Sequence, residues 1–175
     1  MVEKISSFII ENFPFELRVD LDLLSRRNDI LNKDKQDEMF NILRKYKIQN
    51  FVPMLMETNR CTFSLNGYII KCAVEVAGTI DNKKEFEIAN KLQPYVCQVY
   101  EINSNYHVMI CEYIQPFDTF EQMLEHKEEI VSISHQLSST YSLGDFVISE
   151  NNFRKWGIRI GTNKPVCIDF ADLIR

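Results

Sequence analysis

The sequence has little glycine or proline, no long apolar stretch and no excess of basic residues. Its 175 residues include five glycines and five prolines but twelve phenylalanines and seven tyrosines, which argues against extended disorder. No apolar stretch approaches the roughly 20 residues of a membrane span, so no membrane partner is expected. The net charge of −5 gives no electrostatic reason to expect nucleic acid, because proteins that bind it usually carry a basic patch.

The five cysteines include no Cys-x-x-Cys pair, and the three histidines are isolated from them in the sequence. Several cysteines lie inside apolar runs, such as 108–111 and 166–168. We therefore expect buried free thiols rather than disulfides or a zinc site. The sequence begins with no recognisable signal peptide, and reduced thiols suit the cytoplasm, which is the expected location.

The spacing of apolar residues changes near residue 51. Before it, helical spacing predicts a small helical cap over residues 1–50, with an amphipathic helix at 34–46. After it, Asn66-Gly67 predicts a two-residue turn between strands, because both turn positions need positive φ. Further elements are expected as helices at 82–92, 118–126 and 127–140 and as strands at 61–65, 68–74, 96–102, 107–114, 157–160 and 165–170. This order predicts an α+β fold.

Lys71 lies within an otherwise apolar strand. A buried lysine is costly unless a carboxylate or phosphate meets it, and the next helix supplies Glu85 and Glu87 as candidates. The alternative is an outward-facing lysine on an edge strand, where it would discourage association between sheets.

Two aspartates, Asp145 and Asp169, follow later in the chain, the first after Gly144 and the second inside an Ile-Asp-Phe run. Two carboxylates in one cleft can hold Mg²⁺ and orient a hydroxyl, which is most of what phosphoryl transfer requires. The alternatives are a solvated turn after a helix, with Gly144 as its left-handed cap, and an exposed strand end.

The order of these residues resembles the protein kinase-like superfamily, in particular its small bacterial and phage members and the aminoglycoside phosphotransferases. Those families carry a strand with a lysine, a hinge similar to residues 112–114, a Gly-Asp loop followed by asparagine, and an Ile-Asp-Phe metal motif. The resemblance covers residues from about 51 onward. It implies a minimal bilobal fold, with the cap (1–50) followed by an N-lobe (51–114) and a reduced C-lobe (115–175).

The resemblance also implies ATP and Mg²⁺ as cofactors and gives each residue a role. Lys71 would contact the α- and β-phosphates, and Glu85 would pair with Lys71, with Glu87 as the fallback. The backbone of Glu112, Tyr113 and Ile114 would bind adenine, and Asp145 would be the catalytic base. Asp169 would be the main Mg²⁺ ligand, and Asn152 or Asn151 would be a further metal ligand.

The sequence departs from the family pattern at several positions. Residues 54–65, where a glycine-rich phosphate loop belongs, contain no glycine, so the backbone is hindered from approaching phosphates closely. Leu143 replaces the loop histidine, and Ala171 replaces the glycine after Asp-Phe. Three functions stay open: a degenerate ATP- and Mg²⁺-dependent phosphotransferase, a pseudokinase-type module that binds a host or partner protein, and an unrelated α+β interaction protein.

Overall fold

The computed structural model describes residues 9, 11–56, 59–138 and 148–171. Within it the chain forms two compact units, each assembled from two segments. The first unit comprises Met1–Lys83 and Val99–Glu112, and the second comprises Lys84–Gln98 and Tyr113–Arg175. Each unit contains its own antiparallel sheet, so the expected mixed α+β architecture is confirmed.

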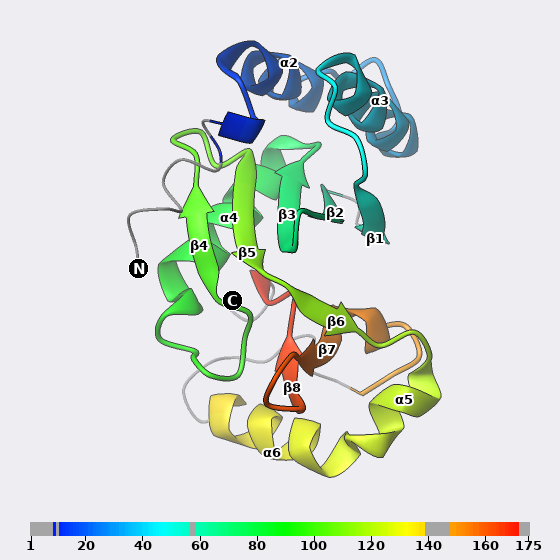
Figure 1. The fold of residues 1–175 in the computed structure, drawn as a ribbon, viewed down its shortest axis with the longest axis vertical. Helices are drawn as coiled ribbons and strands as arrows, with labels where there is room; N and C mark the ends of the chain where they lie inside the picture. Colours follow the sequence, from blue (N-terminus) through cyan, green and yellow to red (C-terminus); the bar gives the residue numbers. More distant parts are fainter. Residues whose placement is uncertain (1–8, 10, 57–58, 139–147, 172–175) are drawn as a thin grey trace. The chain divides into compact units, whose positions relative to one another are not determined.

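The first unit contains a five-stranded sheet in the order β1-β2-β3-β5-β4, with every neighbouring pair antiparallel (Figure 1). The strands are β1 (Val52–Met56), β2 (Arg60–Leu65), β3 (Tyr68–Ala73), β4 (Val99–Ile102) and β5 (Val108–Glu112). The predicted hairpin is confirmed between β2 and β3, where Asn66 and Gly67 have φ values of 51° and 80°. Glycine adopts such a φ without steric cost, and the Asn-Gly turn therefore fixes the register of Leu65 opposite Tyr68.

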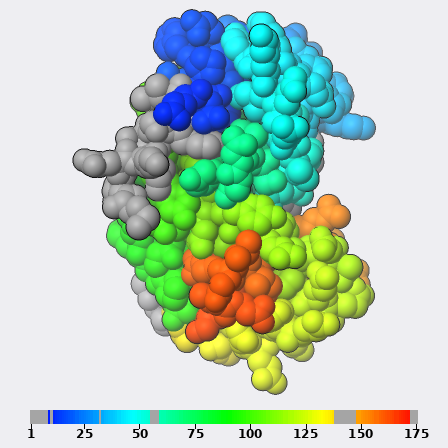
Figure 2. All heavy atoms as spheres, in the orientation of Figure 1, coloured from blue at the N-terminus to red at the C-terminus, as the bar shows by residue number. Residues whose placement is uncertain are grey.

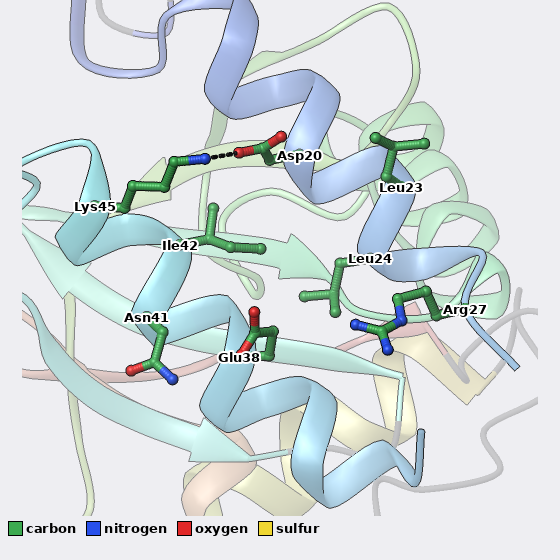
Figure 3. A pocket seen from close by; sticks show the side chains of 8 residues that line it. All are labelled: Asp20, Leu23, Leu24, Arg27, Glu38, Asn41, Ile42 and Lys45. Atoms are coloured by element: carbon green, nitrogen blue, oxygen red, sulfur yellow. Dashed lines mark hydrogen bonds and ion pairs between the residues drawn. The ribbon is translucent and has the colours of Figure 1, made fainter. Parts of the chain in front are cut away.

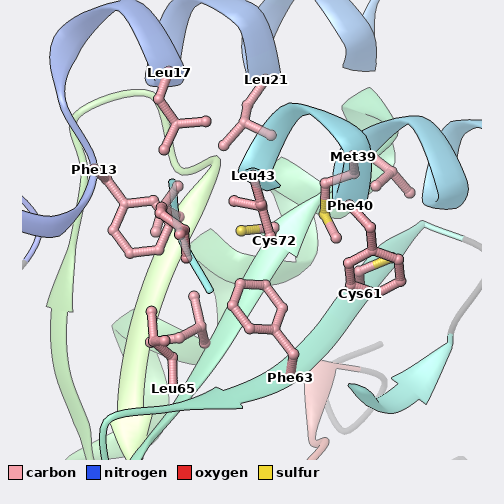
Figure 4. Close-up of a cluster of buried hydrophobic side chains, with 14 of the residues drawn as sticks. Phe13, Leu17, Leu21, Met39, Phe40, Leu43, Cys61, Phe63, Leu65 and Cys72 are labelled. Carbon is pink, nitrogen blue, oxygen red and sulfur yellow. The ribbon is translucent and has the colours of Figure 1, made fainter. Parts of the chain in front are cut away.

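Two helices, α2 (Phe15–Ser25) and α3 (Asn32–Lys45), pack on one face of this sheet. Their apolar residues recur at helical spacing, so one face of each helix is buried. Figure 4 shows these side chains meeting residues of β2 and β3. The labelled members of this core are Phe13, Leu17, Leu21, Met39, Phe40, Leu43, Cys61, Phe63, Leu65 and Cys72. The helix predicted at 34–46 is thus confirmed with small shifts at its ends.

Helix α4 (Val76–Ala89) begins six residues before the expected start at 82. Its first turns lie against β2 and β3, where a Cβ on Gly78 would come within 2.3 Å of the Asn59 carbonyl oxygen. Buried Arg60 donates to Asn82 Oδ1 at 3.4 Å from the same part of the sheet. Glycine at position 78 therefore permits a close approach between helix and sheet.

The second unit contains a three-stranded antiparallel sheet in the order β6-β7-β8 (Figure 1). The elements are β6 (Ile114–Pro116), α5 (Phe120–Glu125), α6 (Lys127–Ser138), a 3-10 turn η1 (Phe153–Lys155), β7 (Trp156–Arg159) and β8 (Lys164–Cys167). Thr119 caps α5, with its side chain accepting from the Gln122 N–H at 3.3 Å. The two predicted helices and the last strand pair are confirmed in this unit.

All five cysteines are buried free thiols, as expected. Across the described ranges, no helix is both long and apolar enough to cross a membrane.

Candidate functional site

Asp169 lies two residues after the end of β8 and is only 9% exposed. The backbone N–H groups of Ile168 and Asp169 donate to the carbonyl of Lys155 at 2.7 and 3.4 Å. The Cys167 thiol donates to the Asp169 carbonyl at 3.0 Å. The predicted metal ligand is therefore buried and held by its neighbours, which rules out the alternative of an exposed strand end.

The Asp169 carboxylate has a cationic neighbour. Lys155 Nζ lies 3.6 Å from Asp169 Oδ2, and the lysine side chain is mostly shielded, with 21% exposed. Removing two charges from water carries a desolvation cost, which their mutual attraction offsets. The ammonium of Lys155 thus neutralises the carboxylate that the kinase-like scheme assigns to Mg²⁺.

Glu85 is tied to the same motif through the backbone. Its Oε1 accepts the N–H groups of Phe170 and Ala171, each at 3.1 Å, and the side chain is fully buried. Hydrogen bonds to an ionised carboxylate are roughly twice as strong as neutral ones. The glutamate of α4 therefore fixes the two residues that follow Asp169, whereas Glu87, the fallback, is exposed.

Lys71 occupies the centre of β3 in the first unit, with Thr62 and Met109 as its neighbours in register. β3 has β2 on one side and β5 on the other, and Lys71 has no exposed surface. This excludes the alternative of an outward-facing lysine on an edge strand. Thr62 Oγ1 is also buried and makes no hydrogen bond to any described residue. The expected approach of Lys71 to Glu85 stays a prediction.

The expected adenine-binding residues span the boundary between the units. Glu112 ends β5 opposite Tyr68, and Ile114 begins β6 opposite Arg159, with Tyr113 between them. Their proposed contact with adenine stays a prediction.

Of the remaining predicted site residues, Asn152 precedes η1, and its carbonyl accepts the Lys155 N–H at 3.0 Å. Asp145 lies outside the described residues, so the prediction that it shares a cleft with Asp169 stays untested. Among the residues that the structure describes, no cluster of three or more His, Cys, Asp or Glu side chains could hold a metal ion. Mg²⁺ usually keeps several waters and takes ligands from nucleotide phosphates, so Asp169 need not belong to such a cluster in order to bind it.

Sequence reasoning missed a polar cluster in the first unit. His107 Nε2 lies 3.0 Å from Ser25 Oγ and 3.3 Å from Asp22 Oδ1. Burial lowers the pKa of His107, against the opposing effect of Asp22. A catalytic Ser-His-Asp triad places serine and aspartate on different ring nitrogens, whereas both contact Nε2 here. The cluster therefore links α2 to the start of β5 rather than activating Ser25.

Compared with protein-family models, curated proteins and solved structures, the chain matches none. The kinase-like resemblance therefore stays a hypothesis drawn from the order of short motifs. The proposal about its function therefore rests on the geometry of the chain's own residues.

Proposed function

We propose that the protein is kinase-like and carries a degenerate site for ATP and Mg²⁺. One observation carries this proposal: Glu85 Oε1 binds the backbone N–H groups of Phe170 and Ala171, directly after Asp169. In the kinase-like scheme the helix glutamate and the metal-motif aspartate serve one cleft. The attachment of Glu85 to this motif supports the same division of roles here.

Phosphoryl transfer depends mainly on positioning and charge neutralisation. Lys71, buried on the central strand of its sheet, would neutralise nucleotide phosphates. Asp169 would supply a carboxylate oxygen to Mg²⁺, which prefers oxygen ligands and keeps several waters. When bound, the ion would neutralise charge on the phosphates.

Two features make the proposed site degenerate. Lys155 already neutralises Asp169 at 3.6 Å, so a metal ion must share or displace this partner. Residues 54–65 contain no glycine, which hinders close approach of the backbone to phosphates. We therefore expect ATP to bind weakly, near millimolar, which is only about 4 kcal/mol of binding free energy.

Calorimetric titration of ATP with and without Mg²⁺ tests the proposal. The wild type should bind weakly and only with Mg²⁺, and Asp169→Asn should lose this Mg²⁺-dependent binding. Lys71→Met, which removes the ammonium but keeps the chain length, should weaken binding in the presence of Mg²⁺. Glu87→Gln, an exposed change on α4, serves as the matched control and should bind like the wild type.

A second candidate is a pseudokinase-type module that binds a protein partner without catalysis. The Lys155–Asp169 pair favours it, because a built-in ammonium can stabilise the motif without any metal ion. No ATP binding at any concentration, with or without Mg²⁺, would exclude the first candidate and leave this one. Micromolar Mg²⁺-dependent binding that Asp169→Asn abolishes would instead indicate a working enzyme.

A further inference from the structure

A groove lies between α2 and α3 on the first unit, with a volume of about 490 Å³ (Figure 3). Leu24 and Ile42 form apolar parts of its lining, and Leu23 lines the α2 side with 57% of its surface exposed. Figure 2 shows the two helices, coloured blue and cyan, adjoining at the surface. The groove is thus an apolar surface between two helices that are already packed on the sheet.

The exposed apolar surface continues along α2 beyond the groove. Phe15 and Val19 precede Leu23 at intervals of four residues and are 68% and 38% exposed. Residues four apart lie on one side of a helix, so these three side chains form a stripe. The opposite side of α2 carries Leu17 and Leu21, which are buried in the core. Helix α2 is therefore apolar on two sides, and the described residues bury only one of them.

Four charged residues stand at the corners of the groove and alternate in sign. At one end Asp20 of α2 pairs with Lys45 of α3 at 2.9 Å (Figure 3). At the other end the groove is lined by Arg27, just after α2, and by Glu38 of α3 (Figure 3), and Arg27 forms an ion pair with Asp29 at 2.6 Å. The α2 side thus carries an acid then a base, and the α3 side carries a base then an acid.

An alternating quartet of this kind is complementary to itself. In one arrangement the α2 of a second copy lies over the α3 of the first copy. Asp20 of each copy then faces Lys45 of the other, and Arg27 of each copy faces Glu38 of the other. In the other arrangement the α2 helices of the two copies lie over each other and run in opposite directions. Asp20 of each copy then faces Arg27 of the other, and Lys45 of each copy faces Glu38 of the other. Both two-fold arrangements place each acid of the quartet opposite a base of the quartet, so the interface can be isologous.

We infer that this groove is a homodimer interface, in which the α2–α3 pairs of two copies form a four-helix layer. Leu23 and the half-buried Ile42 supply the apolar contact, which provides most of the free energy of association. The charged corners contribute little affinity, because exposed ion pairs are weak, but they select the partner and its orientation.

Sedimentation velocity over a concentration series tests this inference on the full chain. The wild type should shift with concentration from the mass of one chain to twice that mass. Leu23→Glu should abolish the shift, since it places a charge in the apolar contact. Ile80→Glu, an equally drastic change at an exposed position of α4, should leave the shift intact.

Two charge variants make the test specific. A basic-groove variant (Asp20→Lys with Glu38→Lys) and an acidic-groove variant (Arg27→Glu with Lys45→Glu) each carry four like charges and should stay monomeric. Mixed in equal amounts they should form a one-to-one dimer, and added salt should weaken it. Their association also shows that both variants are folded. A wild type that remains monomeric throughout, or variants that fail to associate on mixing, would overturn the inference.

Discussion

Glu85 Oε1 accepts the backbone N–H of Phe170 at 3.1 Å, across 85 positions of sequence, and accepts the N–H of Ala171 at the same distance. All of these groups are buried, so they are shielded from bulk water in the folded chain. The conformation of the backbone after Asp169 therefore depends on a glutamate at position 85.

Replacing Glu85 with alanine should leave two buried N–H groups unmatched and lower the free energy of unfolding by roughly 2–4 kcal/mol. Glu85→Gln retains one acceptor oxygen and should lose less. Urea denaturation measures both changes, and Glu87→Ala on the exposed side of α4 is the control. Equal stability for Glu85→Ala and Glu87→Ala would contradict the structural role of this carboxylate.

Lys155 should oppose metal binding at Asp169, because its ammonium lies 3.6 Å from the carboxylate. If the proposed site binds Mg²⁺ with ATP, Lys155→Met should raise the affinity roughly three- to tenfold, or about 1 kcal/mol. Lys164→Met, an exposed lysine of β8, controls for the general loss of positive charge. Weaker binding in Lys155→Met would instead make Lys155 a phosphate contact.

Stability should fall as the pH falls below about 6.5, partly because of His107. Burial lowers the pKa of this histidine in the folded chain, with Asp22 acting in the opposite direction and Arg26 in the same direction. An unfolded histidine titrates near pH 6.5, so the unfolded state takes up the proton first. The stabilisation is complete above that pH and is lost as the pH falls toward the folded-state pKa.

His107→Gln should therefore flatten the dependence of unfolding free energy on pH between about 6.5 and 5. Its absolute stability should also fall, because the contacts with Ser25 and Asp22 change. The slope is the informative measurement, obtained from denaturation curves at several pH values. An identical slope in wild type and variant would mean that His107 has the same pKa in the folded and the unfolded chain.

Gly78→Ala should destabilise the protein by about 1–3 kcal/mol, because the new Cβ would lie 2.3 Å from the Asn59 carbonyl oxygen. This reverses the usual effect, since alanine stabilises a helix by up to about 1 kcal/mol relative to glycine. Ala77→Gly, at the adjacent exposed position, measures the helix-propensity effect alone. A stabilised Gly78→Ala variant would show that α4 can move away from the sheet.

The parts of the fold that were predictable from sequence have strong local signals. Asn66-Gly67 identified its hairpin because few residue pairs tolerate two positive φ angles. Strand β1 was missed, because Pro53 argues against a strand. The structure resolves this by placing β1 at the sheet edge, where a missing N–H is tolerated. The early start of α4 was missed because Gly78 weakens a helical pattern.

For the candidate site, the sequence identified acids and a lysine but not their partners. Lys71 and Asp169 were recognisable as charged residues in apolar strands, and both are buried. The attachment of Glu85 to Phe170 and the neighbour of Asp169 depend on how distant segments meet. Residue spacing carries no information about such contacts. Residue spacing also could not indicate the contact between His107 and Ser25, which are 82 positions apart.

The buried cysteines can report local unfolding of the chain. Burial raises the pKa of Cys72, so a thiol reagent can react only after the surrounding structure opens. Three thiols (Cys61, Cys72 and Cys111) belong to the first unit, and Cys97 and Cys167 belong to the second. The order in which a reagent labels them therefore reveals which unit opens first, without any introduced probe.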